Sequence, residues 1–260
     1  MKKEDIKDFY DDFLTSRMLD YRIKGNKRID KAISRVSNYL NKGDKVLDVG
    51  CGIGLAAEKV SKIVGEKGKV WACDISNKNI WYAKKTVKKK NISFFVADLI
   101  SEKELIEKAI TPDSLDVIYL IDVIEHIPVN EHQHIFELFV KLLNKTGYLV
   151  LTYPSPQYQD YLKKNNSGDL QIIDQVIELD HLQDITSNCN LFLKHYSLEK
   201  VWEKHNQYVH CVFQTNNELR ENDGNNTFSK KVTEKLKFQF KKSFIYPIRH
   251  QKYINSIFKD

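Results

Sequence analysis

The chain has 260 residues, 42% of them hydrophobic, and a formal net charge of +6. This composition suffices to bury a core and excludes a disordered chain. Because no run approaches the roughly 18 apolar residues of a membrane-spanning helix, we also expect no transmembrane segment.

Two amphipathic helices are predicted before residue 40. Apolar side chains recur along one side of residues 4–24, and they return at three- and four-residue spacing in residues 28–40. The acidic, polar start of the chain also lacks the apolar stretch of a secretion signal.

From residue 45 onward, short apolar strands alternate with helical segments. This alternation indicates right-handed βαβ units and a parallel sheet covered on both faces, which is an α/β fold. The predicted strands are 45–50, 69–74, 92–98, 115–122 and 147–153, and the predicted helices are 53–64, 77–90, 101–110 and 130–143.

The pattern loosens after the fifth strand. Residues 154–192 contain polar turns and short amphipathic pieces, and we interpret them as an insertion over the substrate. Two further strands, 194–204 and 207–215, are predicted to be joined tightly, and 216–228 is a polar linker. We therefore expect domains at 1–40, 41–215 and 229–260.

The sharpest motif is the glycine-rich segment Asp48–Gly54, which follows a strand and opens a helix. Alternating glycines let the backbone turn tightly and approach a ligand closely. The spacing is G-x-G-x-G and lacks the Lys-Ser/Thr of a phosphate loop. The carboxylate of Asp48 before the first glycine would repel a pyrophosphate and attract an ammonium group.

Two more acids close the next strands. Asp74 follows the second strand, where a carboxylate can accept hydrogen bonds from ribose hydroxyls. Asp98 follows the third strand, where it can meet an adenine amino group. A ligand with an ammonium end, a ribose and an adenine describes S-adenosylmethionine better than NAD, although strand-end Asp residues are also common turn residues.

Four segments together resemble the class I S-adenosylmethionine-dependent methyltransferase family, and the resemblance covers about residues 28–215: VLDVGCGIG (46–54), VWACD (70–74), FVADL (95–99) and LDVIYLIDVIEHIP (115–128). The resemblance implies a seven-stranded, mostly parallel Rossmann-like sheet with N-terminal lid helices. It also implies a cofactor site, with the glycines under the methionine part and Ile75 and Leu99 beside the adenine. The implied cofactor-binding residues are Asp48, Gly50, Cys51, Gly52, Gly54, Asp74, Ile75, Asp98, Leu99, Ile121 and Asp122.

The segment after the fourth strand bears on the methyl acceptor. It lacks the Asn/Asp-Pro-Pro-Tyr/Phe of base-methylating enzymes, and no Cys lies between Cys73 and Cys189 to attack a cytosine. A nucleic-acid substrate is therefore not expected. The D-V-I-E-H-I form resembles O- and N-methyltransferases of small molecules, natural products and peptides.

Candidate catalytic residues are His126, His181 and Tyr21. Histidine titrates near neutrality and suits proton removal from an acceptor, but His126 could equally orient the turn after the strand, and His181 could equally cap a helix. Arg17, Arg22 and Tyr153 are candidate substrate-binding residues, since the family's lid helices and the turn after the fifth strand border the substrate mouth.

A metal-dependent alternative uses Asp122, Glu125, His126 and His181. This set resembles the carboxylate–histidine set of metal-assisted RNA 3′-terminal ribose methyltransferases, where a divalent ion lowers the pKa of a hydroxyl. We expect no metal, because metal-free relatives also carry Glu-His here. We interpret His132 and His134 as surface residues. A non-catalytic cofactor-binding scaffold is the alternative of another class.

The net charge is concentrated at the end of the chain. Residues 229–260 contain nine basic and two acidic residues, a net +7, which leaves −1 on the other 228 residues. An apolar stripe among these lysines is compatible with packing on the body or a homodimer partner, with an acidic membrane surface, or with an acidic macromolecule such as a peptide or RNA. The four cysteines show no C-x-x-C pair and favour reduced thiols in a cytoplasmic, or membrane-peripheral, protein.

Overall fold

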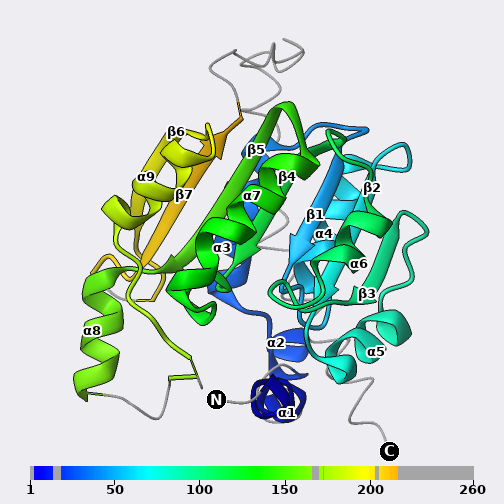
Figure 1. The fold of residues 1–260 in the computed structure, drawn as a ribbon. Coiled ribbons are helices and arrows are strands. Elements are labelled where there is room, and N and C mark those ends of the chain that lie inside the picture. The colour runs from blue at the N-terminus through cyan, green and yellow to red at the C-terminus, as the bar shows by residue number, and fades with distance from the viewer. Residues whose placement is uncertain (1–2, 14–18, 166–169, 172, 203–204, 216–260) are drawn as a thin grey trace, which may run out of the picture. The chain divides into compact units, whose positions relative to one another are not determined.

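A computed structural model describes residues 3–13, 19–165, 170–171, 173–202 and 205–215 (Figure 1). The chain divides into Met1–Glu218 and Leu219–Asp260. The second part, with the predicted basic extension and most of the predicted linker, lies outside the described residues, as does Arg17. Among the helices of the described residues, none is long and apolar enough to cross a membrane.

One seven-stranded sheet, in the order β3-β2-β1-β4-β5-β7-β6, forms the centre of the described residues. Neighbouring strands from β3 to β5 pair in parallel, whereas β7 runs antiparallel between β5 and β6. The predicted fold class is therefore confirmed. The strands are β1 Lys45–Val49, β2 Lys69–Asp74, β3 Ile92–Val96, β4 Leu115–Ile121, β5 Leu143–Pro154, β6 Phe192–Glu199 and β7 Tyr208–Gln214.

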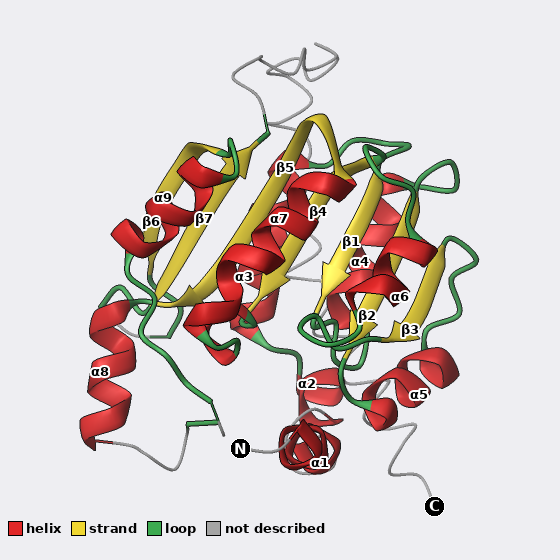
Figure 2. Cartoon of the chain, viewed as in Figure 1, coloured by secondary structure: helices red, strands yellow, loops and turns green. Residues whose placement is uncertain are grey.

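Helices cover both faces of this sheet (Figure 2). Alternate residues of β1 point to opposite sides, so Leu47 packs in a core with α6, α7 and α9, and Val46 packs in a second core with α3, α4 and α5. The helices are α1 Lys3–Phe13, α2 Leu19–Lys24, α3 Lys27–Val36, α4 Leu55–Val64, α5 Asn77–Thr86, α6 Lys103–Ala109, α7 His132–Leu142, α8 Pro156–Asn165 and α9 Leu179–Asn188, with short 3₁₀ turns at Ser37–Tyr39, Ile124–His126 and Val129–Glu131.

Several boundaries differ from the sequence-based expectations. The helix predicted over 77–90 ends at Thr86, because Val87 is buried in an extended conformation. β6 ends at Glu199 instead of residue 204, and the following connection is held by Gln207, whose side-chain oxygen accepts from the backbone N–H of Trp202 at 2.9 Å. The region 154–192, predicted as an insertion of short pieces, contains the helices α8 and α9.

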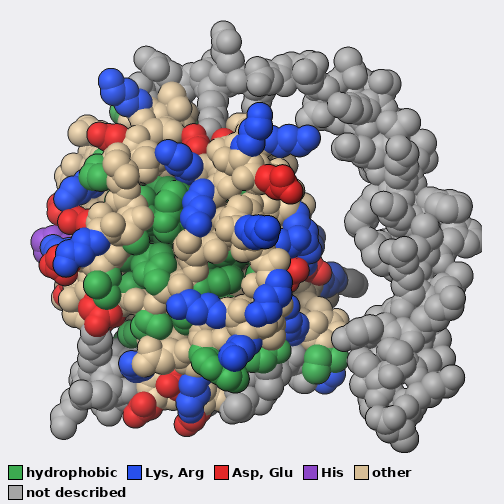
Figure 3. Space-filling model, turned by 90° about the vertical axis from the view of Figure 1, so that its right-hand side faces the viewer, with side chains coloured by type: hydrophobic (Ala, Val, Ile, Leu, Met, Phe, Trp, Pro, Cys, Tyr) green, Lys and Arg blue, Asp and Glu red, His purple; other side chains and the backbone are tan. Residues whose placement is uncertain are grey.

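The sheet presents two different edges. β3 forms one of them, and its residues are half-buried. On that side of the molecule, Lys and Arg side chains lie around a group of apolar ones (Figure 3). The carboxyl ends of β1 to β5 lie together at one end of the sheet, where open α/β sheets bind their ligands.

Candidate functional site

A cavity of about 520 Å³ lies at the carboxyl ends of the parallel strands. It contains residues from all four sequence motifs, so segments that are far apart in the chain form one site. Its lining residues include Tyr10, Tyr21, Arg28, Asp48, Gly50, Cys51, Gly52, Asp74, Ile75, Asn79, Asp98, Leu99, Ile121, Asp122 and His126.

The glycine-rich turn forms the floor of one end of the cavity. Gly50, Gly52 and Gly54 all have positive φ values, between 51° and 78°, which is the left-handed region that favours glycine. A Cβ on Gly50 would also lie 2.4 Å from Cγ2 of Val123. Gly54, the N-cap of α4, does not line the cavity.

Asp74 ties this turn to the end of β2. Its Oδ2 accepts from the Gly52 N–H at 2.8 Å, and its Oδ1 accepts from the Ser76 N–H at 2.9 Å and from the Asn79 amide at 3.2 Å. The carboxylate is 8% exposed, and burial raises its pKa while these hydrogen bonds lower it. An oriented, buried carboxylate at this position suits the two hydroxyls of a ribose.

Asp48 and Asp98 border the same cavity on either side of Asp74. Asp48 is 2% exposed, and its Oδ2 is buried and has no hydrogen-bond partner among the described residues. Burial raises the pKa of Asp48 to about 8. The Asp98 carboxylate accepts from the Ile100 N–H at 2.9 Å and from the Ser101 hydroxyl at 2.6 Å. The unpartnered oxygen of Asp48 fits an ammonium group such as that of S-adenosylmethionine.

At the other end of the cavity, the His126 ring is held in one orientation. Its Nδ1 lies 2.6 Å from the carbonyl oxygen of Ile173 and 3.4 Å from Oδ1 of Asp174. Nδ1 therefore carries the proton, and the lone pair is on Nε2, which is buried without a hydrogen-bond partner. Burial lowers the pKa of His126, although Asp174 and the Ile173 carbonyl raise it, so the neutral ring can act as a proton acceptor.

A buried ion pair lies beside this histidine. Nη1 of Arg28, from α3, lies 2.8 Å from Oδ2 of Asp122 and 3.2 Å from the Tyr208 hydroxyl. Asp122 directly follows β4 and has a φ of 55°, an uncommon conformation for a residue with a side chain. The pair fixes this carboxylate at the wall of the cavity.

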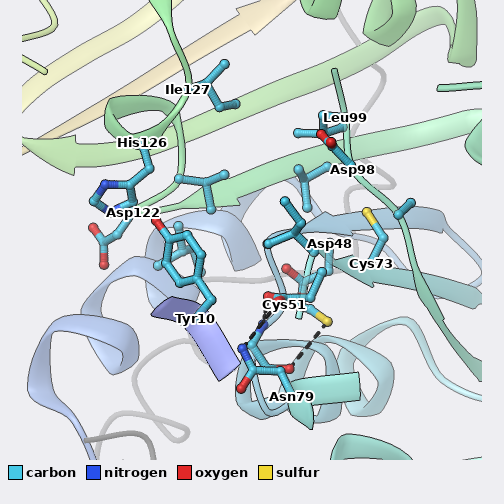
Figure 4. A pocket seen from close by; sticks show the side chains of 18 of the residues that line it. Tyr10, Asp48, Cys51, Cys73, Asn79, Asp98, Leu99, Asp122, His126 and Ile127 are labelled. Atoms are coloured by element: carbon cyan, nitrogen blue, oxygen red, sulfur yellow. Dashed lines mark hydrogen bonds between the residues drawn. The ribbon is translucent and has the colours of Figure 1, made fainter. Parts of the chain in front are cut away.

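Tyrosines from the N-terminal helices complete the wall. Tyr10 of α1 and Tyr21 of α2 both line the cavity, and Tyr10, Asp122 and His126 lie at the same end of it (Figure 4). The rings of Tyr10 and His126 are 6.3 Å apart. The Asp11 carboxylate accepts from the Ser76 hydroxyl and the Lys78 N–H, so α1 is held against the start of α5.

Besides Gly54, three predicted site residues are not in the cavity. Nη2 of Arg22 lies 3.5 Å from Oε2 of Glu58 and from the Thr86 carbonyl, so Arg22 connects α2 with α4 and α5. Tyr153 is fully buried in the core under the sheet. His181 lies on α9, with its Nε2 2.9 Å from Nδ1 of His132. The lining residues include none of these three side chains.

The same geometry bears on the metal-dependent alternative and corrects one further interpretation. Among the described residues, which include Asp122, Glu125, His126 and His181, no group of three or more His, Cys, Asp or Glu could hold a metal ion. His132, interpreted as a surface residue, is fully buried, because it shares one stripe of α7 with Ile135 and Phe136. His134 is exposed, as expected.

Sequence reasoning did not identify Arg28, Asp174 or Tyr10 as site residues. Arg28 directly precedes Ile29, which packs against one of the two cores, but no pattern in the sequence indicates that Arg28 would reach the site. Tyr10 lies in the predicted helix over residues 4–24, whose amphipathic pattern indicates packing and no contact with a ligand. Asp174 lies in the segment without periodicity, where no pattern indicates which side chain turns inward.

Comparison with known proteins identifies a common family. A methyltransferase-domain family model matches residues 40–217. Ribosomal protein L11 methyltransferase of Thermotoga neapolitana is 33% identical over 87 residues, which is 33% of this chain and 32% of that protein. The chain thus spans about a third of that relative's length.

Solved structures with a similar fold have low sequence identity. Magnesium protoporphyrin IX methyltransferase from Synechocystis PCC 6803, with bound S-adenosylhomocysteine, has a TM-score of 0.62 and 16% identity, covering 83% of this chain and 100% of that one. Phosphoethanolamine N-methyltransferase 2 of Haemonchus contortus, in complex with S-adenosylmethionine, has a TM-score of 0.55 and 14% identity, covering 79% of this chain and 59% of that one. With the family match over most of the chain, the cofactor is S-adenosylmethionine, and the protein belongs to the class I S-adenosylmethionine-dependent methyltransferases.

Proposed function

We propose that this enzyme transfers a methyl group to an oxygen or nitrogen of a small-molecule, natural-product or peptide substrate, with His126 as the base. The observation that carries this proposal is the fixed His126 ring. Its Nδ1 is engaged by the Ile173 carbonyl, and its Nε2 is unpartnered. The ring lines the cavity at the end away from Asp98 and Leu99 (Figure 4).

Each proposed cofactor-binding residue would contact a different part of S-adenosylmethionine. Asp48 would bind the ammonium group, Asp74 the ribose hydroxyls and Asp98 the adenine amino group. The turn Gly50–Gly52 would pass under the methionine part, and Ile75 and Leu99 would pack on the adenine. When bound, S-adenosylmethionine supplies a methyl group already activated by a positively charged sulfur, so the protein's main tasks are positioning and proton removal.

His126 is suited to the proton step. A neutral imidazole with one nitrogen engaged and the other unpartnered accepts a proton in a defined direction. Asp174, 3.4 Å from Nδ1, would stabilise the imidazolium that results. Tyr10 and Tyr21 would close the cavity over the reacting groups and exclude water.

The relatives' names do not define the acceptor. They specify a ribosomal protein, a magnesium porphyrin and phosphoethanolamine. A metal-dependent RNA ribose methyltransferase is not favoured, because His181 is bonded to His132 away from the cavity. A non-catalytic scaffold would not need an oriented base beside the cofactor pocket.

Methyl-labelled S-adenosylmethionine, incubated with the protein and a fractionated cell extract, tests the proposal. We expect label in a small-molecule or peptide fraction, and retention of this activity in the presence of a strong chelator. Label found only in RNA, with loss of activity on chelation, would favour the metal-dependent alternative. Cofactor binding by calorimetry without label transfer to any fraction would favour the scaffold.

A further inference from the structure

Several buried polar atoms of the described residues have no hydrogen-bond partner at the end of the cavity where we place the methyl acceptor, and Asp122 Oδ1 and His126 Nε2 are two of them. The side chains of Asp122 and His126 are 6% and 10% exposed. Asp122 Oδ1 and His126 Nε2 have no hydrogen-bond partner among the described residues, and both side chains line the cavity at one end (Figure 4). Buried acceptors are normally paired, so these two point to a ligand that donates.

Within the described part of the chain, most of the other unpartnered buried atoms near these two are acceptors, namely Glu125 Oε2 and Gln171 Oε1, while Nε of Arg28 is an unpartnered donor. Arg28 is engaged with Asp122 Oδ2 at 2.8 Å, and the nearest acid to His126 Nε2 is Glu125, whose Oε1 is 3.8 Å away and beyond hydrogen-bond distance. Asp174 lies on the other side of the imidazole. Tyr10 contributes one hydroxyl and an aromatic ring, which also favours a cation.

Each class of methyl acceptor meets these two atoms differently. A carboxylate brings only acceptors, so it cannot pair with either atom, and it places a negative charge beside Asp122. A hydroxyl brings one donor and would leave one buried acceptor unpaired, which costs on the order of a factor of ten in affinity. A primary amine brings two N–H donors and keeps its lone pair free.

We infer that the methyl acceptor is a primary amine whose two N–H groups donate to Asp122 Oδ1 and His126 Nε2. This inference rests on the proposed methyl transfer and specifies its substrate class. The nitrogen lone pair forms the bond to the methyl carbon, while the carbon–sulfur bond breaks and its electron pair remains on sulfur. The resulting methylammonium then gives one proton to His126 Nε2, which leaves a neutral secondary amine.

Cofactor analogues that carry their own acceptor group test this inference without knowledge of the natural substrate. In three analogues of S-adenosylhomocysteine, nitrogen replaces sulfur and bears a propyl arm that ends in an amine, a hydroxyl or a carboxylate. We expect calorimetry to show that the amine arm binds at least about tenfold more tightly than the hydroxyl arm. The carboxylate arm should bind most weakly of the three.

Variants connect this preference to the two acceptors. Asp122→Asn combined with Arg28→Met removes both members of the ion pair, so that no buried charge is left alone, and the preference for the amine should fall below about threefold. If that double variant does not fold, His126→Leu, which leaves the ion pair intact, should reduce the preference in the same way. Asp160→Asn, on the exposed side of α8, is the matched control and should keep it.

The outcomes separate the two proposals. Hydroxyl or carboxylate arms that bind as tightly as the amine arm, or a preference that survives in the variants, would overturn the amine assignment and leave methyl transfer intact. Failure of the wild-type protein to bind S-adenosylhomocysteine itself, or to transfer label, would instead overturn the proposed function.

Discussion

Nδ1 of His132 and Nε2 of His181 lie 2.9 Å apart where α7 packs against α9. Nε2 of His132 lies 2.9 Å from the carbonyl oxygen of Ile127, so Nε2 carries the proton and Nδ1 accepts from His181. Burial lowers the pKa of His132 to about 4. The contact therefore connects α9 to the segment that follows His126.

This contact predicts a loss of stability in acid. An unfolded histidine takes up a proton near pH 6.5, whereas folded His132 does so only near pH 4. Its contribution is thus complete above about pH 6.5 and is lost as pH falls towards 4, by about 1 kcal/mol per pH unit. Burial also lowers the pKa of His210 to about 4, so His210 adds a similar pH dependence to the free energy of unfolding. Urea unfolding between pH 7.5 and 5 gives the free energy of unfolding as a function of pH. This free energy should depend less steeply on pH in His132→Gln than in the wild type, and equally steeply in exposed His134→Gln. Equal slopes in all three proteins would contradict the assignment.

Asp74→Ala should weaken S-adenosylmethionine binding at least about tenfold. The variant removes a proposed partner of the ribose hydroxyls. It also leaves the Gly52 N–H without the carboxylate to which it donates. Calorimetry on the variant and on Asp160→Ala, an exposed control on α8, makes the comparison. An unchanged dissociation constant for Asp74→Ala would remove the ribose role.

Cofactor binding should release a proton below pH 8. The pKa of Asp48 is about 8 in the free protein, and an ammonium group beside the carboxylate favours its charged form. Affinity should therefore fall as pH decreases below 8, by up to about tenfold per pH unit. Calorimetry in buffers of different ionisation enthalpy measures the released proton directly. Asp48→Asn should abolish the release, and a release that persists in this variant would assign it to another group.

His126→Gln should lower turnover by about 10²-fold or more, with cofactor affinity changed little. The glutamine keeps a polar side chain but cannot take up the proton. Turnover is measured as the rate of methyl transfer to any acceptor found by labelling, and calorimetry gives the affinity for the cofactor. His134→Gln, exposed on α7, is the control. A variant that retains wild-type turnover would show that the ring only orients the turn after β4.

Gly50→Ala should destabilise the protein and impair cofactor binding more than Gly43→Ala does. Both glycines have positive φ, but a Cβ at Gly50 would lie 2.4 Å from Val123, whereas Gly43 has nothing within 4 Å. The control thus carries backbone strain alone, of order 1 kcal/mol. Adding Val123→Ala should recover part of the difference in thermal unfolding. No recovery would indicate that backbone strain, and not the side-chain contact, limits the turn.

The sequence was most informative where one physical rule dominates. Short apolar runs that alternate with helical segments identified β1 to β5, and the acids near the strand ends, Asp48, Asp74 and Asp98, line one cavity. The rule is that parallel strands bring their carboxyl ends to the same end of the sheet, so a residue's position after a strand predicts its position in space.

The end of the cavity around Asp122 and His126 was less predictable from the sequence, because its arrangement depends on tertiary packing. Asp-His at 180–181 had the same appearance in sequence as Glu-His at 125–126, but α9 packs His181 against His132, away from the cavity. Arg28 reaches Asp122 across 94 residues of chain, and no local pattern specifies such a pairing.

The hydrogen bond from the Gly52 N–H to Asp74 joins the parts of the site that would hold opposite halves of the cofactor. An adenosine fragment that orients Asp74 would therefore also order the turn for the amino-acid half. The two fragments should bind with positive cooperativity, and each should raise the affinity of the other by the same factor. In such a site, the protein itself couples the two halves of the cofactor, so a covalent linker between them adds less to the affinity. Adenosine-sized compounds are therefore a sound starting point for ligand design.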